Sequence, residues 1–210
     1  MLSGFFEPIA VPAGQPRPTG TDLVGLRVGI DASTLLGRNV LLEVDPAARY
    51  EKVIKAFALE WISEEYVIFT FTSKGSPVYV ALSDVLGSRF YTLSEKVSYP
   101  RPGSTQYEVL VPRNDHSILL NVLDKTLKTN PNLKMAVVFD SVSDVILSSS
   151  FESAYKFLKQ ANELVGSSGK TAIFLITKAA HSERESNIVR SLFPNQLSYD
   201  SRGLDVSKLA

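Results

Sequence analysis

Short apolar runs alternate along this chain with segments whose apolar residues recur at helical spacing. The clearest runs are 66–72, 134–140 and 171–177, which are rich in β-branched and aromatic residues. Runs of this kind are typical of strands that are covered on both faces of a sheet. Three shorter runs predict further strands, at 38–44, 107–111 and, as an edge strand, 195–204.

Four amphipathic segments follow these strands, at 47–62, 115–127, 151–165 and 183–193. Strands that alternate with helices at this spacing predict right-handed crossovers. The expected fold class is therefore α/β, with a mostly parallel sheet and helices on both faces. Ligands of such sheets bind outside the carboxyl ends of the strands, which here means the segments just after each apolar run.

The junction between the first strand and the first helix carries a helix-start signal, Asp45-Pro46. Aspartate is a preferred N-cap residue, and proline is tolerated at the first helical position. We therefore expect the helix to begin at this point. Asp45 is expected to cap its N-terminus and to satisfy the N–H groups that would otherwise attract an anion.

The chain of 210 residues is long enough for one sizeable core, and its 44% hydrophobic content is ordinary for a globular protein. Residues 11–20 hold three prolines and two glycines with no helical or strand period, as an extended linker does. We therefore divide the chain into an N-terminal arm with a Pro-rich linker, 1–24, and one α/β domain, 25–210.

Charge and composition exclude several classes of function. Lys plus Arg and Asp plus Glu both number 22, so no overall field attracts a polyanion. The absence of cysteine excludes thiolate metal sites, and two histidines leave little for a histidine site, so no metal is expected. The first residues have no basic start and are interrupted by Glu7 and Pro8, unlike a signal peptide. We expect a cytoplasmic protein with no membrane span.

Two segments resemble signatures of the RecA/KaiC-like ATPases. The segment from Leu42 to Phe57, with Asp45-Pro46, is similar to the KaiC-like strand, phosphate loop and helix. The segment from Met135 to Ser143 resembles that family's second signature, an apolar strand that ends in Asp-Ser-x-Ser. The likeness covers roughly residues 25–204 in order and spacing. It implies a three-layer RecA/KaiC-like core.

The phosphate loop of an active relative reads G-x-x-x-x-G-K-[ST], and none of these residue types is present here. Val44 and Arg49 stand at the glycine positions, Tyr50 at the lysine position and Glu51 at the hydroxyl position. Lys52 comes one or two places late. A side chain at a glycine position disfavours the required backbone, and Glu51 places negative charge where a triphosphate would lie.

The resemblance also implies a catalytic acid after the second strand and a magnesium-positioning acid after the later one. Ser73 or Lys74 stands where the catalytic acid would be, so the group that orients water is missing. Asp140 is retained and is interpreted as a strand-end or capping residue. Two independent losses predict a non-catalytic domain without a cofactor; ATP with magnesium belongs only to the alternative, a divergent nucleotide-binding ATPase.

Two other chemistries were weighed. Ser141, Asp140 and His181 could meet at the strand ends as a hydrolytic group, but no G-x-S-x-G turn presents the serine. Nucleic-acid binding is the further alternative, since basic residues and tyrosines interleave around a Pro-rich loop; the balanced charge disfavours it. Its candidate residues are Arg89, Tyr91, Lys96, Tyr99, Arg101, Tyr107 and Arg113.

The N-terminal arm carries the clearest signal for a protein partner. Phe5, Phe6 and Ile9 are large apolar residues outside any evident core, and a stiff linker follows them. RecA-like proteins commonly join subunits through such an arm, although Phe6-Glu7-Pro8-Ile9-Ala10 departs from their Phe-x-x-Ala form. The expected partner is a second copy or a related RecA/KaiC-like subunit; the alternative is an arm that folds back on its own domain.

Overall fold

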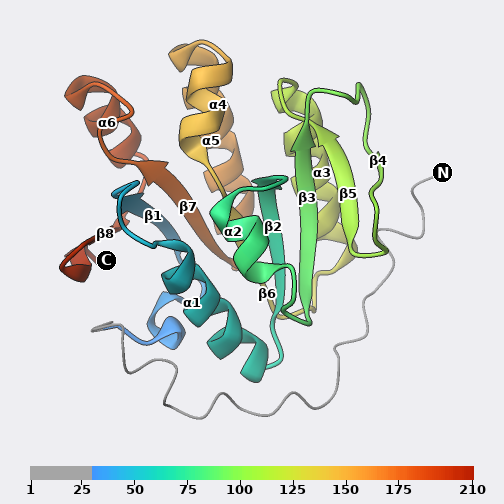
Figure 1. Cartoon of the computed structure of the whole chain (residues 1–210), viewed down its shortest axis with the longest axis horizontal. Coiled ribbons are helices and arrows are strands. Elements are labelled where there is room, and N and C mark those ends of the chain that lie inside the picture. The colour runs from blue at the N-terminus through green and yellow to red at the C-terminus, as the bar shows by residue number, and fades with distance from the viewer. Residues whose placement is uncertain (1–29) are drawn as a thin grey trace.

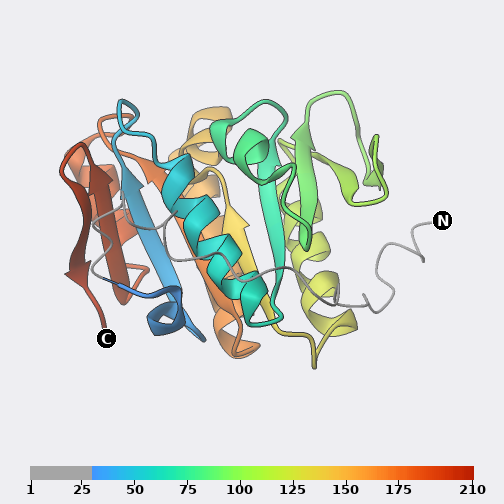
Figure 2. The same cartoon turned by 60° about the horizontal axis from the view of Figure 1, so that its bottom comes forward.

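The computed structural model describes residues 30–210, which form a three-layer α/β core around one nine-stranded sheet (Figures 1 and 2). The strand order is β4-β5-β3-β2-β6-β7-β1-β8-β9. The seven inner strands are parallel to their neighbours, and only the edge strands β4 and β9 run antiparallel. The strands are β1 (Asn39–Val44), β2 (Val67–Ser73), β3 (Ser88–Ser94), β4 (Arg101–Pro102), β5 (Glu108–Pro112), β6 (Met135–Phe139), β7 (Thr171–Thr177), β8 (Asn195–Asp200) and β9 (Gly203–Lys208).

The helices cover both faces of the sheet. One face packs against the short 3-10 helix η2 (Ala32–Leu35), α1 (Glu51–Ser63) and α2 (Pro77–Leu82). The other face packs against α3 (His116–Thr129), α4 (Val142–Ser148), α5 (Phe151–Ser167) and α6 (Glu183–Arg190). Figure 2 shows α1 crossing the near face with α3 and α5 behind the strands. The predicted α/β class, parallel sheet and two helical layers are confirmed.

Alternating residues of the central strands enter two separate cores. On β1, Leu41 joins the core under α3 and α5, whereas Val40 and Leu42 join the core under α1. Aromatic rings dominate the first core, where Phe71 stacks on Phe139 at 5.4 Å between ring centroids. A fully buried aromatic side chain is worth about 1.5–3 kcal/mol relative to exposure. The central strands are apolar on both faces because both faces are covered.

Two local predictions differ from the structure. The first helix starts at Glu51, not at Asp45, because the six residues 45–50 lie between it and β1. The single predicted edge strand 195–204 is a hairpin, in which β8 turns at Asp200 into the antiparallel β9.

Within residues 30–210 no helix is long and apolar enough to cross a membrane.

The buried carboxylate of Glu108 attaches the β4 edge to the sheet. Ser104 donates to it from its backbone N–H (2.8 Å) and its hydroxyl (2.7 Å), and Thr92 donates from the neighbouring strand (2.8 Å). Burial opposes ionisation of Glu108, but these hydrogen bonds outweigh burial and hold its pKa below the ordinary value. Gly103 packs directly against this side chain, and a Cβ there would collide with it.

We expect Gly103→Ala to destabilise the fold by about 1–3 kcal/mol, the usual cost of overpacking, because the four-bonded Glu108 side chain has little freedom to move away. Urea unfolding, followed by the fluorescence of Trp61, measures the change. In a Glu108→Ala background the added methyl group has nothing to collide with, so the penalty should largely vanish. An equal penalty in both backgrounds would contradict this packing.

Candidate functional site

The carboxyl ends of the parallel strands lie together at one edge of the sheet. The chain leaves β1 and β2 toward the layer of α1 and α2, whereas it leaves β6 and β7 toward the opposite layer. Neighbouring strands that diverge in this way open a crevice outside their carboxyl ends, where ligands of α/β sheets bind. Two such crevices exist here, between β1 and β7 and between β2 and β6.

The loop from β1 to α1, where the sequence resemblance places a degenerate phosphate loop, is held by hydrogen bonds within the chain. The Asp45 N–H donates to the Tyr199 carbonyl at 2.9 Å, and the Ala48 N–H donates to the Asp45 carbonyl at 3.0 Å. The Asp45 carboxylate accepts from the Ala47 N–H at 2.9 Å. Asp45 therefore fixes a turn just after the strand.

The first turn of α1 begins without a side-chain cap. Tyr50 occupies the N-cap position and makes no capping bond, so the prediction that Asp45 caps this helix is wrong. The N–H groups of Lys52 and Val53 donate instead to the carbonyls of Arg49 (3.1 Å) and Tyr50 (3.0 Å). Within the phosphate-loop register, the Ala48 N–H donates to the Asp45 carbonyl and the Tyr50 N–H to the Ala48 carbonyl, so these two donors are occupied within the chain.

The side chains of this loop separate into an exposed pair and a packed ring. Arg49 and Glu51 form a surface ion pair at 3.4 Å, and Lys52 is exposed. Tyr50 packs against the core under α1. Its pKa is raised to about 12, first by burial and then by the carboxylates of Asp140, Glu51 and Asp144. The ring at the lysine position therefore stays neutral and lies near the end of β6.

Asp140 is nearly fully buried, with 4% of its surface exposed, between the ends of β6 and β2. The hydroxyls of Thr72 and Ser76 each lie 2.7 Å from its Oδ2 and 2.7 Å from one another. Three such contacts need three protons, of which the two hydroxyls supply two. A proton on the carboxyl group completes the triangle. Burial also raises the pKa of Asp140, against the opposing effect of the two hydroxyls.

Ser73 and Lys74 stand at the predicted position of the catalytic acid. Their side chains carry a hydroxyl and an ammonium group, and neither is a carboxylate. The Ser73 hydroxyl accepts from the Arg113 guanidinium at 2.7 Å and lies 3.5 Å from the Asp144 carboxylate. Lys74 donates to the Ser104 hydroxyl at 3.3 Å. Each of the two side chains is therefore engaged by a neighbouring loop.

Ser141 and His181 serve different elements and do not form a hydrolytic group with Asp140. The Ser141 hydroxyl caps α4 by accepting from the Asp144 N–H at 3.2 Å. His181 Nε2 lies 2.8 Å from the hydroxyl of Ser143, which also accepts from the Thr177 N–H at 2.9 Å. Burial lowers the pKa of His181. Ser143, which the sequence analysis named only as the last residue of the Asp-Ser-x-Ser signature, thus ties the end of β7 to α4.

The remaining candidates fall outside this region. Phe5, Phe6 and Ile9 lie outside the described residues. The basic and aromatic residues around the Pro-rich loop are not one surface, because Tyr91 is buried and the guanidinium of Arg89 is 4.2 Å above the ring of Tyr107. Across residues 30–210, histidines and acids do not gather in a group of three that could hold a metal ion.

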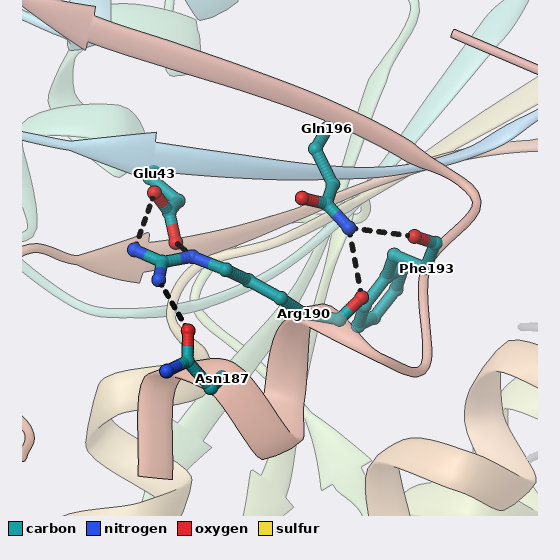
Figure 3. Close-up of polar contacts among 5 residues, drawn as sticks. All are labelled: Glu43, Asn187, Arg190, Phe193 and Gln196. Atoms are coloured by element: carbon teal, nitrogen blue, oxygen red, sulfur yellow. Dashed lines mark hydrogen bonds and ion pairs between the residues drawn. The ribbon is translucent and has the colours of Figure 1, made fainter. Parts of the chain in front are cut away.

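The sequence analysis did not predict a further polar network, which is built around Glu43 and Arg190. The one indication of it in the sequence is that Glu43 is a carboxylate within an apolar strand. Figure 3 shows Arg190 of α6 bound to Glu43 of β1 through two parallel contacts, of 2.6 and 3.1 Å. The Asn187 side chain accepts from the same guanidinium at 2.8 Å. The Gln196 amide donates to the carbonyls of Arg190 and Phe193, both at 2.9 Å. The network fixes α6 across the carboxyl end of β1.

Comparison with known proteins adds a fold-level likeness alone. No family model matches the chain, and no curated protein matches it in sequence. A solved structure from Pyrococcus horikoshii, presented only as a structural study, superposes with a TM-score of 0.63 at 14% identity. The match covers 85% of this chain and 92% of that one. At this identity the likeness supports the three-layer fold and says nothing of activity.

The Asp140 triangle predicts how stability depends on pH. A carboxyl whose pKa is raised on folding stabilises the protein below the unfolded pKa, and this contribution is lost as the pH rises through the folded value. Asp140→Asn, which supplies its own donor, should therefore remove that decline and leave the protein at least as stable as the parent at neutral pH. Urea unfolding from acid to mildly basic pH tests this.

Asp84→Asn is the matched control, since Asp84 is a mostly exposed carboxylate whose described partner is the surface cation of Lys55. Its curve should run parallel to that of the parent chain. A loss of more than about 2 kcal/mol in Asp140→Asn at neutral pH would show that an ionised carboxylate is needed there, because that is the scale of a lost buried charge contact.

Proposed function

We propose that this chain is a non-catalytic RecA/KaiC-like domain, located in the cytoplasm, that acts as an interaction or regulatory protein. The observation that carries the proposal is the β1–α1 loop, in which the N–H groups of Ala48 and Tyr50 donate to the carbonyls of Asp45 (3.0 Å) and Ala48 (2.9 Å). A phosphate-binding loop offers such groups to its ligand. This loop offers the neutral ring of Tyr50 and the carboxylate of Glu51.

Charge at the strand ends supports the same proposal. A bound triphosphate with magnesium is held by cations, free N–H groups and an available carboxylate. Here Arg49 is paired with Glu51, and Lys52 points to solvent. Oδ2 of Asp140 is enclosed by two hydroxyls at 2.7 Å, so a metal could bind this oxygen only if the triangle broke.

The position of the catalytic base supports the absence of hydrolysis. Ser73 and Lys74 follow β2 where an active relative places its acid, and the Ser73 hydroxyl is held by Arg113. A hydroxyl bound to a guanidinium is a poor acceptor for the proton of an attacking water. Binding and chemistry are thus disfavoured by separate groups on separate strands.

We predict that the chain shows no saturable binding of ATP with magnesium in calorimetry at micromolar concentrations and releases no phosphate. Glu51→Gln and Tyr50→Lys together should at most create weak binding, because the backbone donors remain occupied. Micromolar binding by the parent chain, or turnover abolished by Asp140→Asn, would instead establish the divergent ATPase.

The partner is proposed to be a second copy or a related RecA/KaiC-like subunit, contacted through the arm 1–11. Large aromatic residues usually carry most of the energy of an interface, which makes Phe5 and Phe6 the expected anchors. The Pro-rich residues 11–20 would let such an arm reach a neighbour without a floppy tether.

Light scattering of the full chain and of a chain that starts at Gly20 tests the arm. The shorter chain should have a lower assembly mass and keep its melting temperature, because the first strand of the sheet begins only at Asn39. Phe5→Ala with Phe6→Ala in the full chain should reproduce the loss. Equal masses with a lower melting temperature would mean that the arm packs on its own domain.

A further inference from the structure

A polar cleft of about 320 Å³ lies outside the carboxyl ends of β1 and β7, on the side of α6. This is one of the two crevices that the diverging strand connections create. Its volume is at the lower end of the range for small-molecule sites. The cleft is separate from the Asp140 triangle, and the inference below does not depend on the RecA/KaiC assignment.

One wall of the cleft, the turn from β7 to α6, is firmly held. The Lys178 N–H donates to the Val44 carbonyl at 2.8 Å, which extends the pairing of β7 with β1. His181 and the Thr177 N–H both contact the hydroxyl of Ser143, whose exposed fraction is 4%. Because the turn is anchored at three points, the groups that it presents are preorganised.

The facing wall is fixed by the Glu43–Arg190 pair. The two parallel contacts hold α6 on β1, and the hydrogen bonds that Arg190 donates to Glu43 raise the pKa of Arg190. The charges of this pair are matched to each other and partly shielded from solvent. They therefore shape the cleft and contribute no net charge to it.

The backbone of the same turn is strained. Ala179 lines the cleft with φ = 62°, in the left-handed region that residues other than glycine rarely adopt. Such a conformation costs about 1 kcal/mol or more and is concentrated at ligand clamps and active sites. The strain is an observation independent of the cavity, and it falls on the same few residues.

Several polar groups that line this cleft are not engaged by the protein. Among the side-chain hydrogen bonds and ion pairs of residues 30–210, none involves the Lys178 ammonium, the Glu183 carboxylate or the Ser186 hydroxyl. Lys178 and Glu183 both line the cleft yet are not paired with each other. The cleft thus offers one cation and one anion that make no direct contact with each other, while Glu183 lies near enough to Arg190 to raise its pKa and Lys178 near enough to Asp200 to lower the pKa of that carboxyl.

We propose that this cleft binds a small zwitterion of the size of a free amino acid. Lys178 would hold the carboxylate of the ligand and Glu183 its ammonium group, with the Ser186 hydroxyl as a further partner. A ligand with only a negative charge is attracted by Lys178 but repelled by Glu183. A ligand with only a positive charge is attracted by Glu183 but repelled by Lys178. Only a ligand with both charges uses both groups.

Calorimetry with the full chain tests the proposal, using each of the proteinogenic L-amino acids as a probe. At least one should bind saturably. Its N-acetyl form, which lacks the cation, and its amide, which lacks the carboxylate, should each bind about tenfold more weakly or worse, the scale of one lost charged hydrogen bond. Inorganic phosphate serves as the purely anionic probe.

Variants locate the binding. Lys178→Met and Glu183→Gln should each weaken the binding of the amino acid at least tenfold and leave the melting temperature unchanged. The control is Lys52→Met, which changes an exposed lysine of α1 and should have no effect on binding. No binding by any amino acid, equal binding by the N-acetyl form or phosphate, or binding that survives both cleft variants would each overturn the proposal.

Discussion

The pairing of β1, β7, β6 and β2 in parallel determines almost everything else in this structure. Two parallel neighbours must be joined by a crossover connection, which is usually a helix. These helices cover both faces of the sheet and bury its apolar side chains. Those crossovers place every strand end at one edge of the sheet. The loop after β1, the Asp140 triangle and the cleft under α6 are neighbours for this reason, although up to 147 residues separate their members.

At that edge, burial decides which charges survive. Asp140 is surrounded by protein, and burial raises its pKa against the opposing hydrogen bonds of two hydroxyls. Glu43 is also largely buried, but the guanidinium of Arg190 meets it with two contacts. Tyr50 fills the space near Asp140 with a neutral ring. The edge is therefore polar without the excess positive charge that a polyphosphate requires.

The sequence was sufficient for the class of the fold, because β-branched runs such as 67–73 and 171–177 depend mainly on being covered from both sides. The start of α1 was mispredicted because a contact that is distant in the sequence outweighs the local helix-start signal of Asp45-Pro46. Asp45 resembles a cap, but its N–H pairs with the Tyr199 carbonyl and prolongs the strand path. The partnership of Glu43 with Arg190, and of Ser143 with His181, depends on the order of strands, which periodicity alone does not reveal. The residue types of the β1–α1 loop could be compared with the phosphate-loop pattern from the sequence alone, because that comparison needs no knowledge of the strand order.

The central claim is that the β1–α1 loop is closed by its own backbone. Native-state hydrogen exchange at the amides of Ala48 and Tyr50 tests it most directly, because these N–H groups lie in the phosphate-loop register and donate within the loop. The account predicts that both amides are protected to a similar degree as the interior of α1, and that adding ATP with magnesium changes neither rate. Exchange at the speed of a free amide, together with protection that appears only when ATP is added, would contradict it.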